Sequence, residues 1–554
     1  MTSFIDFIVS KAMTVYPKAA DRFRRSAYAS SLLSGVLLAV SFPSYPSIHF
    51  ELLAWVALVP LLLTVADDPS SGSVFRKSYA AMLAYSAGAL WWVCIATLPG
   101  GIMTIAAQAF FMTVPFMLFF LCNRFWGLRR ALVAFPFMQV GWEWLYMQQD
   151  LSLGWLTLGN SQANLNAMVQ YADITGVWGI SFWLSSFNVL VVLAVLGGRR
   201  LLVPYAGALL AMVLAPLAYS AVVLHAPGGA GRAGTIRVSL VQPDIDPYEK
   251  WDRYTGSETL ELYYRLTGRA VRESRPDLVV WPETALPFFI LDDGNDEYLL
   301  SLRRALSLWR APLLTGFSDI VYAAPGDAPS SAGPGKFDRQ SGRFYETYNA
   351  SMLLSPGVDS LQVYRKVRLV PFAERVPYTE YFPALEQLTF SLAGVGSWGR
   401  GPGPSLMELH PADRKRVRIA NIICYESIFP GYVSEFVREG AELLTLVTND
   451  GWYGTSYGPW QHLAIGRLRC IENRRAMARC ANTGVTECID PFGRTIARVP
   501  WWEEQVLNAE LPLGRELSFY TSHPDLLPKV CVAVSLLVVA SGGIGRLSLR
   551  ARRS

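Results

Sequence analysis

The chain has 554 residues, of which 52% are hydrophobic and only 17% charged, and its formal net charge is +5. Soluble domains carry about 25% charged residues, so the composition excludes an ordinary soluble protein. The basic residues gather in short loops and at both ends, which indicates membrane orientation rather than nucleic-acid binding.

Apolar stretches near the length needed to cross about 30 Å of hydrocarbon recur along the chain. They lie at 28–47, 50–66, 78–97, 101–122, 129–147, 176–197, 201–224 and 526–545. We therefore predict an α-helical membrane domain of about eight spans. Residues 1–224 would hold seven of these helices, and residues 526–554 the final helix and a basic tail.

The positive charges are distributed unevenly between the two ends of these spans. Lys and Arg precede the first span and occur in every second loop and in the tail, at Lys11, Lys18, Arg22, Arg24, Arg25, Arg76, Lys77, Arg124, Arg129, Arg130, Arg199, Arg200, Arg546, Arg550, Arg552 and Arg553. The alternate short loops near 43–49, 98–100 and 148–175 contain neither residue. The positive-inside rule then predicts that both termini are cytoplasmic and that residues 225–525 lie outside.

Two features of the helical part are candidates for function. Glu143 lies near the outer end of the fifth predicted span, where an ionisable group either has a function or extends to the lipid headgroups. The loop 148–175 is rich in Gly, Asn and Gln and contains Trp155. We interpret it as a loop packed at the membrane interface.

From Thr235 the pattern changes to short β-rich runs that alternate with helical segments. The predicted strands are Ile236–Val241, Leu278–Trp281, Leu313–Phe317, Ser351–Leu354, Val363–Lys366, Val417–Ile423, Leu443–Thr448 and Val485–Ile489. The predicted helices include Glu258–Ser274 and Asp296–Leu308, and segment 324–340 is predicted to be a surface loop. Strands that alternate with helices favour a layered α/β domain with a mixed sheet, over residues 225–525.

Three of these strands end on groups that carry chemistry. One ends on the carboxylate of Glu283, a second on the amine of Lys366 and a third on the thiol of Cys424. Each has an ordinary structural explanation by itself: Glu283 as a turn residue, Lys366 as a solvated surface charge and Cys424 as a small side chain that fills the core. Together they are the nucleophile, the proton acceptor and the cation that acyl transfer through a thioester requires.

The order of the three motifs resembles a known family. Trp281-Pro282-Glu283-Thr284, Tyr364-Arg365-Lys366-Val367 and Cys424-Tyr425-Glu426-Ser427 resemble the Glu-Lys-Cys signatures of the nitrilase (carbon–nitrogen hydrolase) superfamily. Joined to about eight spans, they resemble the apolipoprotein N-acyltransferases. Two departures, Ala373 where the family usually has Gly and the Arg474–Arg479 stretch where Arg-Pro is common, leave the triad unaffected.

The resemblance implies a periplasmic αββα sandwich domain in a multi-pass protein of the bacterial cytoplasmic (inner) membrane. Cys424 would carry an acyl group from a phospholipid, typically phosphatidylethanolamine, in a ping-pong reaction. The acceptor would be the α-amino group of the S-diacylglyceryl cysteine of an apolipoprotein. Glu283 would transfer protons, and Lys366 with the backbone N–H of Tyr425 would stabilise the oxyanion. We expect a monomer with no metal and no organic cofactor.

Further residues are predicted to support this site or to bind substrate. Glu374 and Glu426 would orient Lys366 and shape the pocket. The other candidates are Tyr425, Trp251, Glu143, Trp155 and Asn449. His462 could form a Cys-His dyad with Cys424. Because Glu283 and Lys366 already supply the base and the cation, we favour a structural role for His462 beside Trp460.

Segment 375–400 mixes bulky apolar side chains with glycines, so it is either a cover that limits water at the site or an ordinary surface loop. The seven cysteines are an odd number, which argues against a complete disulfide framework, although a Cys480–Cys488 pair is conceivable.

Two rival functions remain open from the sequence. A membrane-anchored nitrilase-type amidase would use the same triad, but it would not need so many spans. A non-catalytic membrane protein that binds lipoproteins or a partner would not need Cys424.

Overall fold

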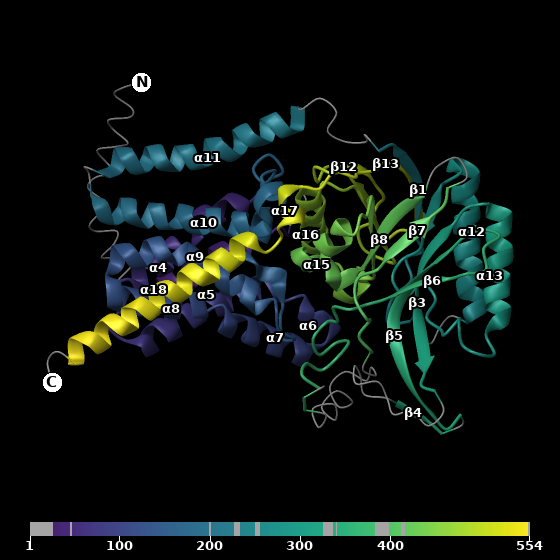
Figure 1. The fold of residues 1–554 in the computed structure, drawn as a ribbon, viewed down its shortest axis with the longest axis horizontal. Coiled ribbons are helices and arrows are strands. Elements are labelled where there is room, and N and C mark those ends of the chain that lie inside the picture. Colours follow the sequence, from purple (N-terminus) through teal and green to yellow (C-terminus); the bar gives the residue numbers. More distant parts are fainter. Residues whose placement is uncertain are drawn as a thin grey trace.

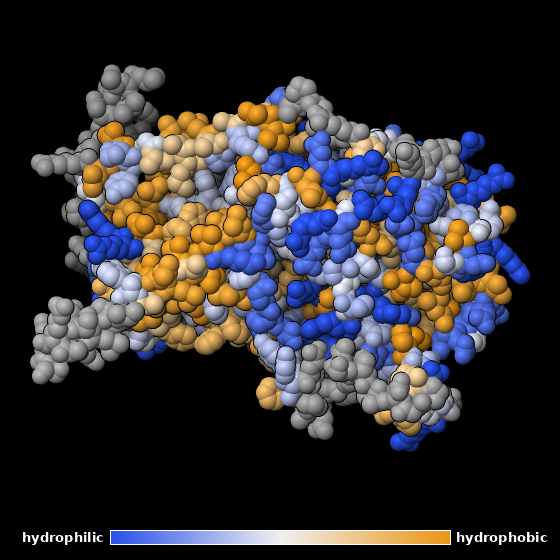
Figure 2. Space-filling view, viewed as in Figure 1, coloured by the Kyte–Doolittle hydropathy of each residue, from blue (hydrophilic) through white to orange (hydrophobic). Residues whose placement is uncertain are grey.

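In the computed structural model, a bundle of helices lies beside a two-sheet α/β domain (Figure 1). The structure describes residues 26–44, 47–198, 201–225, 233–249, 255–324, 336–339, 341–379, 381–382, 398–411 and 416–551. Hydrophobic residues gather on the visible face of the bundle, whereas hydrophilic residues dominate the other domain (Figure 2). The bundle surface is therefore suited to contact with lipid.

Helices occur at every position where a span is predicted. They are α2 (Ala27–Ser41), η1 (Glu51–Leu53), α3 (Ala54–Ala57), α4 (Val59–Val65), α5 (Ser71–Leu90), α6 (Val93–Ala96), α7 (Leu98–Phe111), α8 (Val114–Trp126), α9 (Leu128–Tyr146), α10 (Ala172–Gly197), α11 (Leu202–His225) and α18 (Leu526–Ala551). Among the described residues, three segments are long and apolar enough to cross a membrane, Leu98–Trp126, Ala172–Gly197 and Leu202–His225. The chain is a membrane protein, while the number of about eight spans stays a prediction.

The α/β domain contains two sheets. Strand order in the first is β13-β1-β2-β3-β5-β4, with β6 also paired to β5, and in the second β12-β11-β10-β9-β8-β7. The bounds are β1 (Thr235–Gln242), β2 (Leu278–Val280), β3 (Leu313–Tyr322), β4 (Lys336–Asp338), β5 (Arg343–Leu354), β6 (Gln362–Arg365), β7 (Leu406–Leu409), β8 (Val417–Ile423), β9 (Leu443–Thr448), β10 (Met477–Ala481), β11 (Glu487–Ile489), β12 (Thr495–Arg498) and β13 (Gln505–Pro512). Both sheets are mixed.

Helices cover the outer face of each sheet. Helices α12 (Gly256–Ser274) and α13 (Asp296–Trp309) lie outside the first sheet, and α15 (Pro430–Arg438) and α16 (Gly458–Asn473) lie between the second sheet and the bundle (Figure 1). Strand β9 is buried along its whole length, as expected for a parallel strand covered on both faces. The predicted nitrilase-like α/β sandwich is thus confirmed.

The structure differs from the predicted elements at several places. Lys336–Asp338, inside the predicted loop 324–340, forms strand β4 against β5. Helix α16 was not predicted, because polar residues such as Arg469 are buried along with its apolar ones, so no amphipathic period shows. Strand β10 was missed for a similar reason, since the buried Arg479 interrupts its apolar run.

Helix α16 attaches the α/β domain to the bundle through Gln461. The side-chain oxygen of Gln461 accepts hydrogen bonds from the indole N–H of Trp92 at 3.1 Å and of Trp155 at 2.8 Å. Its amide nitrogen donates to Ser44 Oγ at 3.2 Å and to Ala89 O at 3.1 Å. One fully buried side chain therefore satisfies polar groups from three segments of the helical region.

A second attachment uses a break in α10. Gly176 has φ +64°, so the regular helix is interrupted there, and the N–H of Val177 donates to Glu472 Oε1 at 2.8 Å. Glu472 is in turn paired with Arg469, Nε to Oε2 at 2.7 Å. The backbone N–H of Val177 in the bundle thus has its hydrogen-bond acceptor in a carboxylate of the α/β domain.

We predict that Gln461→Ala lowers the free energy of unfolding, because it leaves the buried indole N–H of Trp155 without its acceptor, whereas the indole N–H of Trp92 keeps Ala89 O at 2.9 Å. An unsatisfied buried polar group costs about 1–3 kcal/mol. The measurement is thermal unfolding of the detergent-solubilised protein. The exposed Gln148 provides the matched control, and a Gln148→Ala variant that is destabilised equally would contradict this account.

Candidate active site

Cys424 lies directly after strand β8, at the first position of the short 3-10 helix η6 (Cys424–Ile428). Its φ is +49°, a conformation that non-glycine residues rarely adopt and that often marks functional sites. Glu426 holds this turn, because its Oε2 accepts a hydrogen bond from the N–H of Ile423 at 2.9 Å. The thiol is therefore presented by a tight turn at the end of a buried strand.

Lys366 follows strand β6, and its side chain is only 1% exposed. Its Nζ donates to Glu283 Oε1 at 3.1 Å and to Glu374 Oε1 at 2.8 Å. Burial lowers the pKa of this ammonium group, but the negative charges of Glu283 and Glu374 outweigh burial and raise the pKa well above its ordinary value. Lys366 is therefore a permanent buried cation.

Glu283 comes shortly after strand β2, and its position depends on a close approach of strand β3. Gly316 lies so near the Glu283 segment that an added Cβ would stand 2.6 Å from Pro282 O and 2.8 Å from Glu283 Cα. Glu283 Oε2 accepts a hydrogen bond from the N–H of Asn449 at 3.0 Å. The Glu283 segment is thus packed against β3 of the first sheet, and its carboxylate is bonded to the residue that follows β9 of the second sheet.

Asn349 also belongs to this cluster of side chains, although no sequence motif marks it. Its Nδ2 donates to Glu283 Oε1 at 2.8 Å and to Glu374 Oε1 at 3.0 Å, and its carbonyl accepts from the N–H of Lys366 at 2.9 Å. It lies inside β5, where a polar residue gives no local signal. Side chains alternate between the two faces of a strand, so Asn349 lies on the same face as Ser351. This alternation was the one sequence feature that could have drawn attention to Asn349.

The charges of Glu283 and Lys366 both affect the pKa of the Cys424 thiol. Burial raises the pKa of Cys424, the carboxylate of Glu283 raises it further, and the cation of Lys366 and a hydrogen bond with Thr448 lower it. The net effect is a pKa well above the ordinary value. Cys424 is therefore protonated at neutral pH, and a base is needed to form its thiolate.

Glu426 and Tyr425 connect the turn that carries Cys424 to its surroundings. Glu426 Oε1 accepts from Tyr364 Oη at 2.7 Å and from the N–H of Val367 at 2.7 Å, so it holds the residue that follows Lys366. Burial raises its pKa, against the effect of these hydrogen bonds. Tyr425 donates its hydroxyl to Ser152 O at 2.6 Å, in the loop that follows α9.

Within the described part of the chain, His462 forms no hydrogen bond with the thiol; it supports the backbone beneath Cys424. Its Nε2 lies 3.1 Å from Cys424 O and 2.8 Å from Ser427 Oγ, and its Nδ1 lies 3.0 Å from Asp450 Oδ1. Burial raises the pKa of Asp450, but Arg479 and His462 outweigh it and lower the pKa to about 2. The ring near His462 is that of Trp155, at 5.5 Å, whereas Trp460 packs on Trp501.

The remaining candidates are placed as follows. Glu143 is buried and does not extend to the membrane surface; its Oε1 accepts from the N–H of Leu158 at 2.8 Å, so it holds the loop that carries Trp155. Trp251 lies outside the described residues, as does most of segment 375–400. Cys480 and Cys488 are both free thiols.

The part of the chain that the structure describes contains no group of three or more His, Cys, Asp or Glu side chains that could hold a metal ion.

Two family models match this chain: carbon-nitrogen hydrolase over residues 237–518, and the apolipoprotein N-acyltransferase N-terminal domain over residues 34–190. The apolipoprotein N-acyltransferase of Chlorobaculum tepidum is 54% identical over 522 residues, covering 94% of this chain and 97% of that one. That of Geobacter metallireducens is 34% identical, covering 94% and 96%. A mutant amidase from Nesterenkonia sp. AN1 is 16% identical to this chain and matches 54% of it and 95% of the amidase, with a TM-score of 0.34.

We predict that alkylation of Cys424 by iodoacetamide is slow at pH 7 and accelerates about tenfold per pH unit, without a plateau below pH 9, because only the thiolate reacts. The raised pKa of the thiol keeps the thiolate fraction small over this range. Quantitative mass spectrometry of the Cys424 peptide gives the rate. Protein unfolded in denaturant is the control, and a plateau near neutral pH in the folded protein would contradict the prediction.

Proposed function

Because the chain belongs to the apolipoprotein N-acyltransferase family and acylates lipoproteins at nitrogen, we propose that the acyl group passes through a thioester on Cys424 in a ping-pong reaction. The donor would be a phospholipid such as phosphatidylethanolamine, and the acceptor the α-amino group of the S-diacylglyceryl cysteine of an apolipoprotein. The observation that carries this proposal is the buried Glu283–Lys366–Glu374 cluster, in which Glu283 and Lys366 act electrostatically on the Cys424 thiol.

In the first half-reaction, Cys424 Sγ attacks the ester carbonyl of the donor while Glu283 takes the thiol proton. The proton acceptor is needed because the thiol is protonated at neutral pH. The tetrahedral intermediate then collapses, the ester C–O bond breaks, and Glu283 returns the proton to the departing alkoxide oxygen. The products are a thioester on Cys424 and a lysophospholipid.

In the second half-reaction, the amine of the acceptor attacks the thioester carbonyl. Glu283 accepts a proton from the attacking nitrogen, the C–S bond breaks, and the thiol of Cys424 is restored as Glu283 releases the proton to it. The lipoprotein gains an amide, and the enzyme returns to its starting state.

Lys366 would stabilise the oxyanion of both tetrahedral intermediates. Its charge is fixed by the two carboxylates, so it need not gain or lose a proton during the cycle. Removing one such donor raises the barrier by about 2.7–4 kcal/mol. Glu374 and Asn349 would keep Lys366 and Glu283 in place.

We also propose the arrangement in the membrane that the charge distribution predicts. About eight helices would span the cytoplasmic membrane, with both termini in the cytoplasm and the domain of residues 225–525 on the periplasmic side. This places Cys424 on the side where the amino terminus of a translocated lipoprotein would be found.

We predict that mass spectrometry of the protein incubated with phospholipid vesicles detects a long-chain acyl group on Cys424, and that adding a diacylated lipopeptide removes it. Cys424→Ala should carry no adduct. Lys366→Met should form the adduct about 10²–10³ times more slowly, because it lacks an oxyanion donor. Hydrolysis of the adduct at the same rate with and without lipopeptide would instead favour the amidase-like alternative.

We predict that alkaline phosphatase fused after residue 230 is active and that the same enzyme fused after residue 199 is inactive, because this reporter folds only outside the cytoplasm. Equal activity of the two fusions would contradict the proposed orientation.

A further inference from the structure

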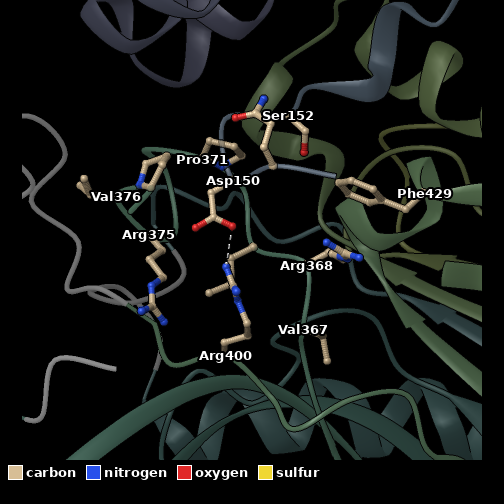
Figure 3. A pocket seen from close by; sticks show the side chains of 12 residues that line it. Asp150, Ser152, Val367, Arg368, Pro371, Arg375, Val376, Arg400 and Phe429 are labelled. Atoms are coloured by element: carbon tan, nitrogen blue, oxygen red, sulfur yellow. Dashed lines mark hydrogen bonds and ion pairs between the residues drawn. The ribbon is translucent and has the colours of Figure 1, made fainter. Parts of the chain in front are cut away.

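Asp150, in the loop after α9, forms an ion pair with Arg400 of the α/β domain. Its Oδ1 lies 3.0 Å from Arg400 Nη2, and the two side chains point toward one another in the wall of a pocket between the two parts of the protein (Figure 3). Both side chains are partly exposed, so the pair adds little to the stability of the fold. Its importance lies in what the Arg400 segment contacts.

The segment that contains Arg400 holds the backbone of two residues of the proposed site. The N–H of Trp398 donates to Glu374 O at 2.9 Å, and the N–H of Gly401 donates to Lys366 O at 2.9 Å. An added Cβ at Gly401 would stand 2.1 Å from the carbonyl oxygen of the residue before Lys366. Segment 398–401 therefore lies directly against the end of β6, and a displacement of Arg400 is passed on to the backbone of Lys366 and Glu374.

The same loop also contacts the turn that carries Cys424. Ser152, two residues after Asp150, accepts the hydroxyl of Tyr425 at 2.6 Å. Cys424 follows β8 of the second sheet, whereas Lys366 follows β6, which pairs with the first sheet. The loop therefore binds both the segment that carries the thiol and the segment that holds the ammonium group.

The helical region holds this loop in place through Tyr146, the last residue of α9. The hydroxyl of Tyr146 accepts a hydrogen bond from the N–H of Leu153 at 3.1 Å and donates one to Gln108 Oε1 of α7 at 2.7 Å. Both side chains are buried. The loop is thus fixed to two helices of the bundle and gives the two segments a common support.

We propose that Asp150 is a positioning residue that acts through Arg400. It holds the ammonium group of Lys366 at the distance from Cys424 that stabilisation of the oxyanion requires. The inference rests on the proposed function, which gives these two residues their roles. The oxyanion forms only as the thiol attacks, so a displaced Lys366 lowers the maximal rate without weakening the binding of the donor.

The test measures N-acylation of a diacylated lipopeptide by the full-length protein in detergent, over a series of phospholipid concentrations. Asp150→Asn should lower the maximal rate about tenfold, because a misplacement of about 1 Å costs up to about a hundredfold. The half-saturating phospholipid concentration should stay the same. Arg400→Gln should have an equal effect, and the double variant should be no slower than either single one, because both changes break one pair. Arg400→Lys, which keeps the charge, should recover part of the rate.

Asp173→Asn is the matched control. Asp173 is also a carboxylate of the helical region that pairs with an arginine of the α/β domain, with Arg474 Nη2 at 2.7 Å from its Oδ2. This variant should keep the maximal rate of the wild type. An equal loss in Asp173→Asn would show that any loosened attachment of the domain slows the reaction, and it would overturn the role of Asp150.

Hydrogen exchange followed by mass spectrometry tests the displacement itself. In Asp150→Asn the amides of residues 398–401 should exchange faster, because their bonds to Lys366 O and Glu374 O open more often. An unchanged maximal rate in Asp150→Asn and Arg400→Gln overturns the inference, and so does a lower rate with unaltered exchange of these amides. A raised half-saturating concentration at an unaltered maximal rate also overturns it, in favour of donor binding at Asp150. A wild type that acylates the lipopeptide without forming acyl-Cys424 refutes the proposed function instead.

Discussion

The ammonium group of Lys366, buried between the carboxylates of Glu283 and Glu374, is the interaction on which the catalytic centre depends. A lone charge in such a place would cost several kcal/mol, so the cation is tolerable only while both carboxylates stay within hydrogen-bond distance of it. The side-chain amide of Asn349 holds the two carboxylates there, because it donates to both. These four residues come from segments on and after β2, β5 and β6. The cluster can therefore form only when the first sheet is folded.

Helix α16 gives this centre its connection to the membrane region. Neighbouring residues of the helix serve opposite sides: Gln461 accepts hydrogen bonds from the indoles of Trp92 and Trp155, while His462 contacts Cys424 O. The turn that carries Cys424 therefore packs against a helix whose other side is held by the bundle. This explains why so much of α16 is polar and yet buried.

The sequence was sufficient to predict a helical region followed by an α/β domain, and β8 and β9 were predicted with their observed bounds. It also marked Glu283, Lys366 and Cys424 as candidates, because each closely follows a predicted strand. It was insufficient for Asn349, α16 and the Asp150–Arg400 pair. Asn349 is one polar residue inside a strand, and α16 lacks an amphipathic period because it is buried on every side. Asp150 and Arg400 are 250 positions apart in the chain, so only the tertiary fold brings them together.

The break in α10 has a consequence for biosynthesis. The N–H of Val177 finds its acceptor in Glu472, a residue 295 positions later in the chain. While the protein is being made, α10 enters the bilayer long before that carboxylate is translated, and hydrocarbon offers no substitute acceptor. In the orientation proposed above, the Gly176 end of α10 would therefore stay within reach of interfacial water until the α/β domain has been exported and folded. Completion of this helix would then be the last step of assembly rather than the first.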